Sequence, residues 1–395
     1  MLKKHLLQSA LRAGLAVSVV LMGPVAYGAH MSTPLDYAVS EGGSATLSVP
    51  IQVPNGIAGM EPQLSLSYSS GSGNGVVGLG WTLTGPSTVS RCPQDVVNDG
   101  VRGSVNFDLN DRFCLDGQRL IQTGTGAYGS DGMTYRTQRD SFSRITSRGN
   151  YLGADGTTQN GVPSSFLVET KGGLLLEFGI SANSQVATTV VGAPKQTVNR
   201  WMLQRVSDRT PNRSFIEFVY CSGKISADGS TCAAPFQGST LLQYIRYTNR
   251  NATLNGENAV IFKYETRPDQ TFGYHAGSLS IQSQRITSIE TYSGFTGPAV
   301  SARGTLVKAY GLSYEPTVDS SGNSIRATIT SRLVSVTERD AAGAALPPLS
   351  FTYATDAVFG QSAVLPTATT SVASPPQPPD TCGGVVNNRV SQLCR

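Results

Sequence analysis

The stretch FLVETKGGLLLEFG, residues 166–179, contains two apolar runs on either side of Lys171, Gly172 and Gly173. Two apolar runs around a short glycine-containing turn are typical of an antiparallel β-hairpin. Further downstream, paired strand-like runs around a polar connection recur in four segments: 201–220, 244–265, 285–316 and 331–353. This recurrence predicts an all-β fold built from multiple antiparallel hairpins that stack into a β-sheet or a partial shell.

Aromatic residues gather on the second strand of the later hairpins, as in the pairs Phe262/Tyr264, Tyr310/Tyr314 and Phe351/Tyr353. We expect these rings to stack across strands or to fill a shared core. The composition agrees with many short strands and tight turns, because the chain has 43 glycines and only 14% charged residues. A length of 395 residues allows one large domain or two ordinary domains with a substantial core.

The segment upstream of these hairpins also has the alternating pattern of β-strands. Residues 46–53 alternate between polar and apolar side chains, with an interruption at Pro50, and residues 64–68 alternate again as the expected partner strand. Residues 30–43 are expected to form a loose lead-in. A glycine-dense stretch, residues 69–81, follows the second strand.

The N-terminus has the features of a secretory signal peptide. Three cations and an apolar run over residues 13–22 are followed by small residues: Lys3, Lys4 and Arg12, then Ala26 and Gly28. This pattern predicts a leader over residues 1–28 and a mature chain from Ala29, although a retained N-terminal anchor is the alternative. No later apolar run reaches a membrane-spanning length. We therefore expect an exported protein, periplasmic or secreted, without stable membrane insertion.

Charge argues against a nucleic-acid partner. Removal of the leader's three cations leaves 27 basic against 26 acidic residues, so the expected mature chain is nearly neutral. Nucleic-acid binding normally needs a basic face that displaces counterions from phosphate. Local arginines such as Arg332 and Arg339 are interpreted as parts of solvated strand faces.

The six cysteines fall into three close pairs: Cys92/Cys114, Cys221/Cys232 and Cys382/Cys394. In an exported protein, an even number of cysteines with local spacing favours disulfides, and pairing between nearest neighbours is the simplest of the 15 possible connectivities. Zinc binding is the competing interpretation. It is disfavoured because the sequence has no CxxC and, beyond residue 30, only His275 as a histidine.

Motifs that suggest chemistry are weak. Gly73, Gly75 and Gly78 match GxGxxG, but strand-like and turn-like residues follow where dinucleotide binding needs a helix. Close backbone packing beside Trp81 is the better explanation. His275 lies among aromatics in FGYHAG with no nucleophile motif beside it, so a structural role is favoured over that of a catalytic base.

Three acids cluster around Cys114 and form the remaining candidate site: Asp108, Asp111 and Asp116. Their neighbours, DLND and LDGQ, favour Asx-turns and hairpin loops. A glycosidase-like acid pair and a calcium site remain alternatives, although the EF-hand spacing is absent. We therefore expect no catalytic, cofactor-binding or metal-binding residues, and no cofactor.

Several blocks together resemble the SpvB family. They are residues 48–81 (SVPIQVPNGIAGMEPQLSLSYSSGSGNGVVGLGW), SRCPQD (90–95), DRFCLDGQRL (111–120), YRTQRDSFSRI (135–145) and LPPLSFTY (346–353). The resemblance spans roughly residues 35–355 with its blocks in order. The same module opens the B subunits of insecticidal Tc toxins and many RHS/YD-repeat proteins. The resemblance implies a non-catalytic, β-rich scaffold within a toxin or RHS assembly, and family members can also reach the host cytoplasm.

The sequence also differs in several features from the family that it resembles. The segment 361–395 is rich in Pro, Ser and Thr, like a linker, and ends in a short tail with two cysteines, so the expected module covers residues 29–360. The ExE pair and STS strand of the family's ADP-ribosyltransferase occur nowhere in the sequence. The leading hypothesis is a module with a protein partner, an RHS/YD-repeat or toxin polypeptide, and a truncated remnant is a further alternative. The other hypotheses are a binding protein for glycans or host surfaces and a glycosidase using the acids near Cys114.

Overall fold

The computed structural model describes residues 32–153, 155–189, 196–210, 214–233, 240–249, 258–275, 278–316, 330–353 and 371–372. As predicted, this part of the chain is all-β. Its helical structure is limited to one α-helical turn, α1 (Val96–Asp99), and two 3₁₀ turns, η1 (Ala182–Ser184) and η2 (Val300–Ala302). In the described ranges no helix is long and apolar enough to cross a bilayer. The predicted leader, residues 1–28, and the predicted start at Ala29 lie outside these ranges.

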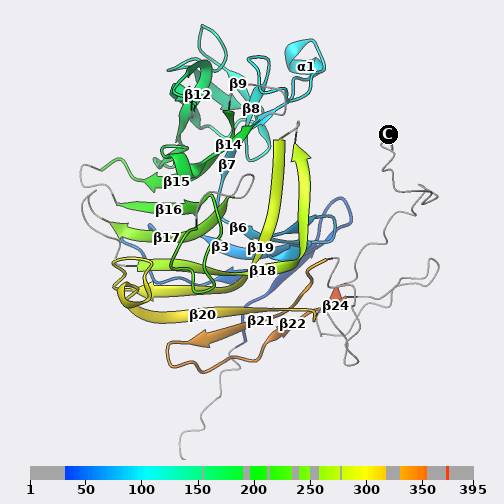
Figure 1. Ribbon diagram of the computed structural model, residues 1–395, viewed down its shortest axis with the longest axis vertical. Helices are drawn as coiled ribbons and strands as arrows, with labels where there is room; N and C mark the ends of the chain where they lie inside the picture. Colours follow the sequence, from blue (N-terminus) through cyan, green and yellow to red (C-terminus); the bar gives the residue numbers. More distant parts are fainter. Residues whose placement is uncertain are drawn as a thin grey trace, which may run out of the picture. The chain divides into compact units, whose positions relative to one another are not determined.

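Eight strands close into an antiparallel barrel, coloured cyan to green in Figure 1. In ring order they are β7 (Thr88–Cys92), β8 (Arg112–Leu115), β9 (Gln118–Gln122), β10 (Thr134–Thr137), β11 (Arg144–Leu152), β12 (Thr158–Glu169), β13 (Leu175–Phe178) and β15 (Gln196–Ser207). The ring closes because β15 pairs with β7 along one edge and with β13 along the other. A closed ring leaves no unpaired edge between these strands.

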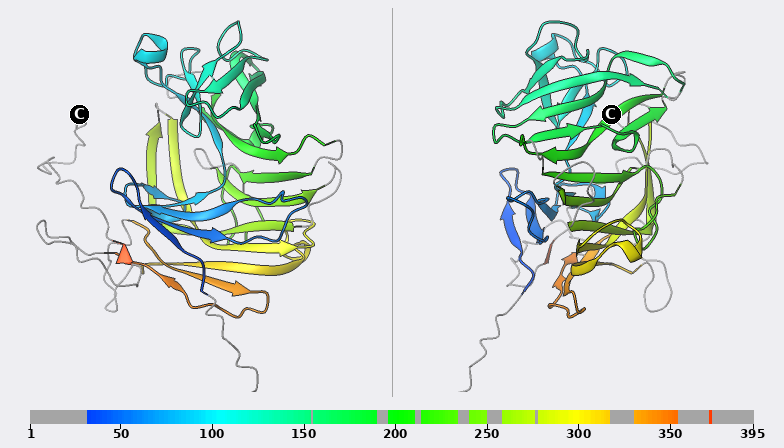
Figure 2. Two further views of the ribbon diagram at one scale, coloured as in Figure 1. Left: turned by 180° about the vertical axis from the view of Figure 1, so that it is seen from behind. Right: turned by 90° about the vertical axis from the view of Figure 1, so that its left-hand side faces the viewer.

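Strand β15 also begins an open sheet, since its last residues pair with β16. The sheet continues through β16 (Phe215–Cys221), β17 (Leu241–Asn249), β18 (Asn258–His275), β19 (Ser278–Ser293), β20 (Thr305–Tyr314), β21 (Leu333–Asp340) and β22 (Leu349–Ser350). β14 (Gln185–Thr189) pairs with the first half of β15. Figure 2 shows this sheet from two further sides.

The five predicted hairpins are all confirmed, as the pairs β12–β13, β15–β16, β17–β18, β19–β20 and β21–β22. The hairpins also pair with one another, because β16–β17, β18–β19 and β20–β21 are antiparallel neighbours. The result is one continuous meander from β15 to β22. The predicted aromatic pairs lie in the core as expected, with Phe262, Tyr264, Tyr310, Phe351 and Tyr353 buried.

A four-stranded sheet covers one face of this meander. It contains β1 (Asp36–Val39), β2 (Ala45–Ile51), β3 (Leu64–Ser69) and β6 (Trp81–Thr84) in that order. Trp81 is fully buried and donates from Nε1 to the Tyr353 hydroxyl at 3.0 Å. The backbone N–H of Gln52 donates to the Tyr310 hydroxyl, also at 3.0 Å. These cross-sheet contacts join residues more than 250 positions apart, so the two layers form one β-sandwich.

Two expectations for the N-terminal segment are wrong. The supposed lead-in contains strand β1, which pairs with β2 from Asp36 opposite Ser48 to Val39 opposite Ala45. Strand β2 runs through Pro50 without interruption. Pro50 is tolerated there because β1 ends opposite Ser48, so on that side the missing N–H leaves no ladder bond unmade.

The glycine-dense stretch packs closely against its surroundings, as the sequence suggested. It forms a two-strand hairpin, β4 (Asn74–Gly75) and β5 (Gly78–Leu79). Gly80 has a φ of +77°, and a Cβ there would lie 2.4 Å from the Tyr68 ring. A Cβ at Gly78 would lie 2.7 Å from the carbonyl oxygen of Ser331. Glycine is therefore needed at both positions for close packing beside the Trp81 core.

A buried polar cluster ties this hairpin to the meander. Arg267 and Asp269, in an irregular part of β18, form an ion pair whose side chains are fully buried. Asn74 Nδ2 donates to Asp269 Oδ2 at 2.8 Å, and the Ser331 hydroxyl also donates to Asp269. Every group in the cluster has a partner, which is the condition under which buried polar groups persist.

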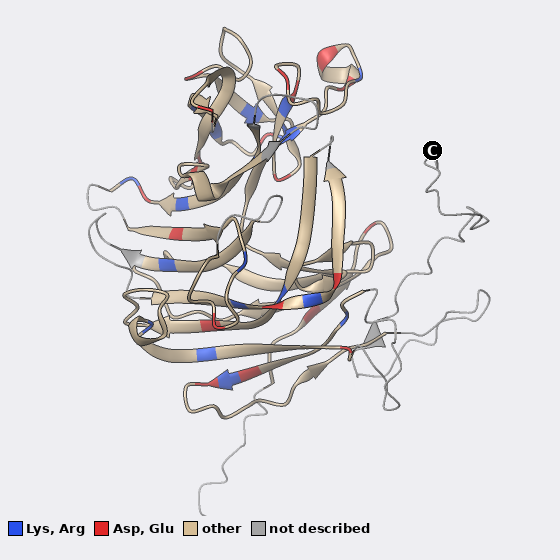
Figure 3. Ribbon diagram, in the orientation of Figure 1, with Lys and Arg blue, Asp and Glu red and all other residues tan. Residues whose placement is uncertain are grey.

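Neighbouring strands of the barrel and the meander carry charges of both signs (Figure 3). Glu177 on β13, Arg205 on β15, Glu217 on β16 and Arg246 on β17 lie opposite one another in register. Arg246 Nε donates to Glu217 at 2.6 Å, whereas the Arg205 contacts to the two glutamates are 3.9 and 4.0 Å long. The charges are interspersed rather than gathered into a patch of one sign.

The sequence predicts that Arg332 and Arg339 lie on solvated strand faces, and this prediction is wrong for Arg332. Arg339 is exposed as expected, but Arg332 is buried against the Tyr353 ring, with its guanidinium carbon 5.5 Å from the ring centre. Burial is possible because the aromatic ring and Glu315 offset the arginine charge.

The end of the chain contributes one described element. β24 (Ser371–Val372), inside the predicted linker 361–395, pairs in parallel with β23 (Thr352–Tyr353).

Candidate functional site

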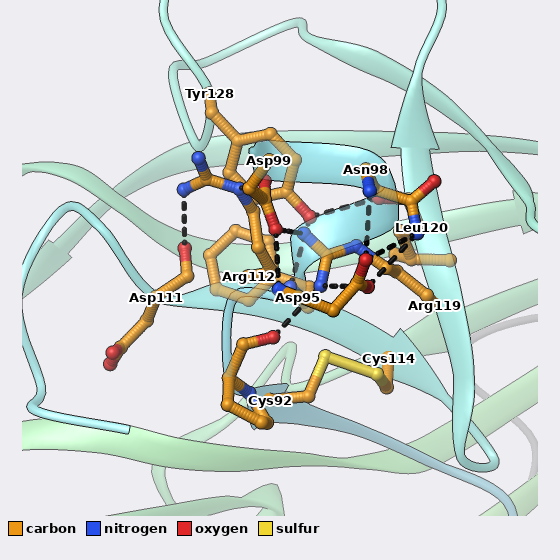
Figure 4. The surroundings of a disulfide bond; sticks show 12 residues. Cys92, Asp95, Asn98, Asp99, Asp111, Arg112, Cys114, Arg119, Leu120 and Tyr128 are labelled. Atoms are coloured by element: carbon orange, nitrogen blue, oxygen red, sulfur yellow. Dashed lines mark hydrogen bonds and ion pairs between the residues drawn. A yellow bond between two sulfur atoms is a disulfide. The ribbon is translucent and has the colours of Figure 1, made fainter. Parts of the chain in front are cut away.

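The disulfide Cys92–Cys114 joins β7 to β8 on the barrel wall, with a Cα–Cα distance of 5.9 Å (Figure 4). A second disulfide, Cys221–Cys232, has a Cα–Cα distance of 5.7 Å. Both follow the nearest-neighbour pairing expected from the sequence. The third candidate pair, Cys382 and Cys394, lies outside the described residues. The first disulfide lies beside a cluster of ion pairs on the barrel.

The loop between β7 and β8, residues 93–111, is fastened to the wall by charged groups (Figure 4). Asp95 caps α1, because its Oδ1 accepts from the backbone N–H of Asn98 at 2.8 Å. Asp99, at the end of α1, accepts from Arg112 Nε at 2.8 Å and pairs with Arg119. Arg119 also pairs with Asp95 at 3.1 Å and donates to the carbonyl oxygen of Pro93 at 2.8 Å. The helical turn is therefore held from both ends.

The electrostatics of this cluster favour charged, paired side chains. Burial alone raises the pKa of Asp99, but hydrogen bonds from the Asp95 backbone and Arg112, with the Arg119 charge, lower it overall. Hydrogen bonds from Asn98 lower the pKa of Asp95. Burial raises the pKa of Tyr128, whose hydroxyl accepts from the Phe113 N–H at 2.9 Å and donates to the Leu120 carbonyl at 3.1 Å. None of these groups is poised to accept a proton near neutral pH.

A shallow groove of about 250 Å³ lies over this cluster and is lined mainly by its polar groups: Asn98, Asp99, Arg112, Arg119, Leu120, Ile121, Gln122 and Tyr128. The arginines and aspartates already neutralise one another. The groove therefore offers a rigid polar surface rather than a free reactive group.

Three valines of this fastened loop are exposed to solvent. Val97 is 89% exposed, and Val96 and Val101 are also exposed. We call these three residues the valine patch. An apolar group that is exposed yet rigidly held can bind a partner at little cost in conformational entropy. The site is thus suited to contact with a partner.

The predicted acids each have a structural role here. Asp111 pairs with buried Arg91 and accepts from the Asn106 N–H at 2.9 Å. Asp108 accepts from the Asn110 N–H at 2.8 Å, which is the expected Asx-turn. Asp116 accepts from the Ser87 hydroxyl and the Thr88 N–H, at 2.5 and 2.9 Å. Across the described residues no group of three or more metal-ligating side chains is present.

The other weak motifs lie elsewhere. Gly75 and Gly78 of the GxGxxG match sit in the β4–β5 hairpin, and the next element is strand β6 rather than a helix. His275 ends β18, but its side chain is outside the described residues.

Sequence reasoning did not single out Asp95, Asp99, Arg112 and Arg119. A local signal exists, because an aspartate followed five residues later by Gly100 marks the start and end of a one-turn helix. No local sequence signal of this kind predicts that Asp95 and Asp99 pair with Arg119.

A second shallow groove, of about 360 Å³, lies on the four-stranded sheet. Most of its lining residues carry a hydroxyl, and Asp36 is its charged residue: Asp36, Tyr37, Ala38, Thr46, Leu47, Ser48, Ser67, Tyr68, Ser69, Ser72 and Thr82.

Comparison with solved structures identifies the fold. The chain matches the N-terminal domain of the effector protein SpvB from Salmonella typhimurium strain LT2, with a TM-score of 0.53 and 18% identity, over 74% of this chain and 98% of that one. It matches a TcdB2-TccC3 crystal structure with a TM-score of 0.59 and 18% identity, over 81% of this chain. A Photorhabdus luminescens Tc holotoxin pore structure gives a TM-score of 0.59 and 18% identity over 82% of this chain.

The chain spans 17% and 16% of the two toxin chains' length, so these likenesses concern the fold of one part of each toxin. No curated protein sequence matches the chain. The family model described as Salmonella virulence plasmid 65kDa B protein matches residues 39–274, from β1 to the far end of β18. Because this match covers more than half of the chain, the protein belongs to the SpvB family.

Proposed function

We propose that the protein is an exported, non-enzymatic structural and interaction module of a toxin-delivery or RHS-like assembly, formed by residues 29–360. The observation that carries the proposal is the valine patch, fastened to the barrel by the Cys92–Cys114 disulfide and the Asp95, Asp99 and Arg119 ion pairs. Exposed apolar groups held on a rigid backbone beside paired charges are characteristic of a preformed contact surface.

The family relationship supports the same role. The similar solved chains include parts of Tc toxins, whose structures contain further toxin polypeptides. By analogy, the partner of this chain is an RHS/YD-repeat or toxin polypeptide. The paired acids and arginines of the barrel wall support binding rather than catalysis, since every one of them already has a partner.

The test is a pull-down of the tagged chain from residue 29 onward, from native periplasmic and secreted fractions, with identification by mass spectrometry. We expect stoichiometric recovery of an RHS/YD-repeat or toxin polypeptide. Val97→Asp should abolish recovery, because it places a charge in the contact surface. Val300→Asp, at an exposed valine on η2, is the matched control and should leave recovery unchanged. A chain that recovers neither class of polypeptide would refute the assembly role.

The hydroxyl-lined groove favours glycan binding as a second candidate function. Tyr37 at this groove is 83% exposed, and an exposed aromatic ring beside hydroxyls and one carboxylate suits a neutral sugar. A glycan array should then give hits that Tyr37→Ala removes. An array without hits, or hits that Tyr37→Ala leaves intact, would exclude this groove as the sugar site.

A further inference from the structure

The far half of the β18–β19 hairpin runs on past the strands that flank it. β17 pairs with β18 only along Asn258–Ile261, whereas β18 continues to His275. Within the described part of the chain, Thr271–His275 pair with Ser278–Gln282 of β19 and with no other strand. In Figure 1 this yellow-green ribbon stands upright, away from the horizontal strands of the meander. We call the β18 residues Thr271–His275 the open edge.

The backbone and the side chains of the open edge are exposed to solvent. Gly273 is exposed, and since it has no side chain, this exposure is that of its backbone. A Cβ at Gly273 would meet no atom within 4 Å. Phe272 and Tyr274, on either side, are 65% and 72% exposed. Ser278 and Ile281 of the neighbouring strand are only 4% and 8% exposed, so β18 rather than β19 faces solvent.

Four apolar side chains share one face of this ribbon. Phe272 lies opposite Ile281 and Tyr274 lies opposite Leu279, and residues directly opposite one another point to the same face of a sheet. Ile281 is buried, so the two exposed rings extend a buried apolar surface out to the open edge. Rings in this position can pack against apolar side chains of a strand that is added to the edge.

The open edge lacks the features that keep strand edges from pairing. Natural proteins protect such edges with charged side chains, proline or a bulge. Residues 271–284 contain no Asp, Glu, Lys, Arg or Pro. The irregular part of β18 lies before Thr271, so the edge itself is regular. By comparison, the exposed edge strand β1 carries Asp36. The open edge is therefore available to a further strand.

We propose that the open edge pairs with the open edge of a second copy of this chain. Two identical strands in antiparallel orientation form a symmetric contact about a two-fold axis. With Gly273 opposite Gly273 of the second copy, Phe272 of each copy lies opposite Tyr274 of the other, which gives two aromatic cross-strand pairs on one face. An identical partner fits a neutral edge, because any net charge on it would be repeated on the other copy and would repel it.

The size of this contact predicts weak association. Buried aromatic side chains contribute about 150–250 Å² each, so four rings bury roughly 600–1,000 Å². Stable protein interfaces bury about 1,200–2,000 Å², and smaller ones are typical of transient contacts. We therefore expect a reversible dimer at micromolar or higher concentration. The inference is independent of the proposed function, because it concerns the pairing of the chain with itself.

Sedimentation velocity of the chain from residue 29 onward, over roughly 1 µM to 1 mM, measures this equilibrium. We expect the weight-average mass to rise with concentration towards twice the monomer mass. Phe272→Lys/Tyr274→Lys should stay monomeric, because it places like charges opposite each other. Phe142→Lys/Leu152→Lys, at two exposed apolar residues of the barrel, is the matched control and should dimerise like wild type. All variants should keep the wild-type midpoint temperature of unfolding, since the replaced side chains are exposed.

A complementary variant tests whether the partner is the same edge. Phe272→Glu/Tyr274→Glu alone should also stay monomeric. Its equimolar mixture with Phe272→Lys/Tyr274→Lys should dimerise, because opposite charges then lie opposite each other.

Four results would overturn the proposal. The first is a wild-type chain that stays monomeric over the whole concentration range. The second is a dimer that persists in Phe272→Lys/Tyr274→Lys, and the third is a mixture of the two charged variants that associates no more than either variant alone. The fourth is a monomeric wild-type chain that captures a different polypeptide through Phe272 and Tyr274, which would assign the open edge to that polypeptide.

Discussion

Arg91 Nη1 lies 2.9 Å from Asp111 Oδ2, and both side chains are only 1% exposed. Arg91 also donates from Nε to the carbonyl oxygen of Val198 at 2.7 Å and from Nη2 to the Thr197 hydroxyl at 3.2 Å. One guanidinium therefore connects β7, the end of the 93–111 loop and the first half of β15. Asp111 therefore contributes to barrel closure.

Replacement of this arginine tests the importance of the pair. Arg91→Met leaves the Asp111 carboxylate buried without its cation, and removal of one partner of a buried pair costs about 3–5 kcal/mol. We expect this loss in the free energy of unfolding measured with urea. Arg136→Met, at an exposed arginine, is the control and should change it by less than about 0.5 kcal/mol. A loss below about 1 kcal/mol for Arg91→Met would show that the pair is dispensable.

The two disulfides should stabilise the fold to different extents. Cys92–Cys114 spans 22 residues and Cys221–Cys232 spans 11. In the loop-entropy model the longer bridge contributes about 3 kcal/mol, and the shorter one roughly 0.6 kcal/mol less. Double Cys→Ala variants, compared by urea unfolding, measure both contributions. Alkylation without reductant, followed by intact mass, should add no label at these four cysteines, and labelling there would disprove the bridges.

The stability cost of a side chain that meets the Tyr68 ring at Gly80 can be measured separately from the cost of a positive φ. Gly80 and Gly43 have similar φ values of +77° and +81°, but a Cβ at Gly43 would meet no atom within 4 Å. Gly43→Ala should therefore cost only the backbone term of about 1–2 kcal/mol. Gly80→Ala should cost clearly more, because the methyl group displaces the Tyr68 ring. Equal losses in thermal unfolding would show that the ring moves freely.

The cluster around Asp269 should be sensitive to the loss of one charge. Hydrogen bonds from Arg267, Ser331 and Asn74 outweigh burial and lower the pKa of Asp269. Asp269→Asn leaves Arg267 buried and unpaired, and we expect a loss of about 3–5 kcal/mol in the free energy of unfolding. Ser331→Ala removes a donor to Asp269 and an acceptor for Arg285 Nη1, and it should cost about 1.5–3 kcal/mol because both partners are charged. The reverse order of the two losses would contradict the assigned roles.

Stability should fall at alkaline pH because of buried tyrosines. Burial, with a hydrogen bond to Glu290, raises the pKa of Tyr292 to about 12, and burial also raises the pKa of Tyr247, Tyr264 and Tyr310. An unfolded tyrosine titrates near 10. The stabilisation is thus complete below pH 10 and is lost as the pH rises towards 12. Urea midpoints should decline over this window, less steeply in Tyr292→Phe, and a constant midpoint would disprove the burial of these hydroxyls.

The hairpins could be predicted from the sequence because each is local. In 166–179 the alternation and the glycine turn lie within one short window, and β12 and β13 form there as expected. Closure of the barrel leaves no such local trace. It depends on Thr88 lying opposite Met202 and on Leu175 lying opposite Ser207, and these partners are separated by long stretches of chain.

The candidate site shows the same difference between local contacts, which the sequence predicts, and long-range contacts, which it does not. Asp108 was recognisable as a turn former because its partner Asn110 is two residues away. The partner of Asp111 is Arg91, on another strand, and Arg332 is buried by Tyr353, which follows it by 21 residues. Burial and ion pairing between strands depend on the register of the folded sheet, which a single sequence does not reveal.

Strand β15 belongs to two hydrogen-bonded sheets at once, the closed barrel through β7 and β13 and the open meander through β16. During synthesis, β7 emerges about 110 residues before the strand that covers its free edge. Until then the barrel has two open edges, which are prone to pair with other chains. The order in which the chain emerges therefore makes β15 the point at which an aggregation-prone intermediate becomes a closed protein.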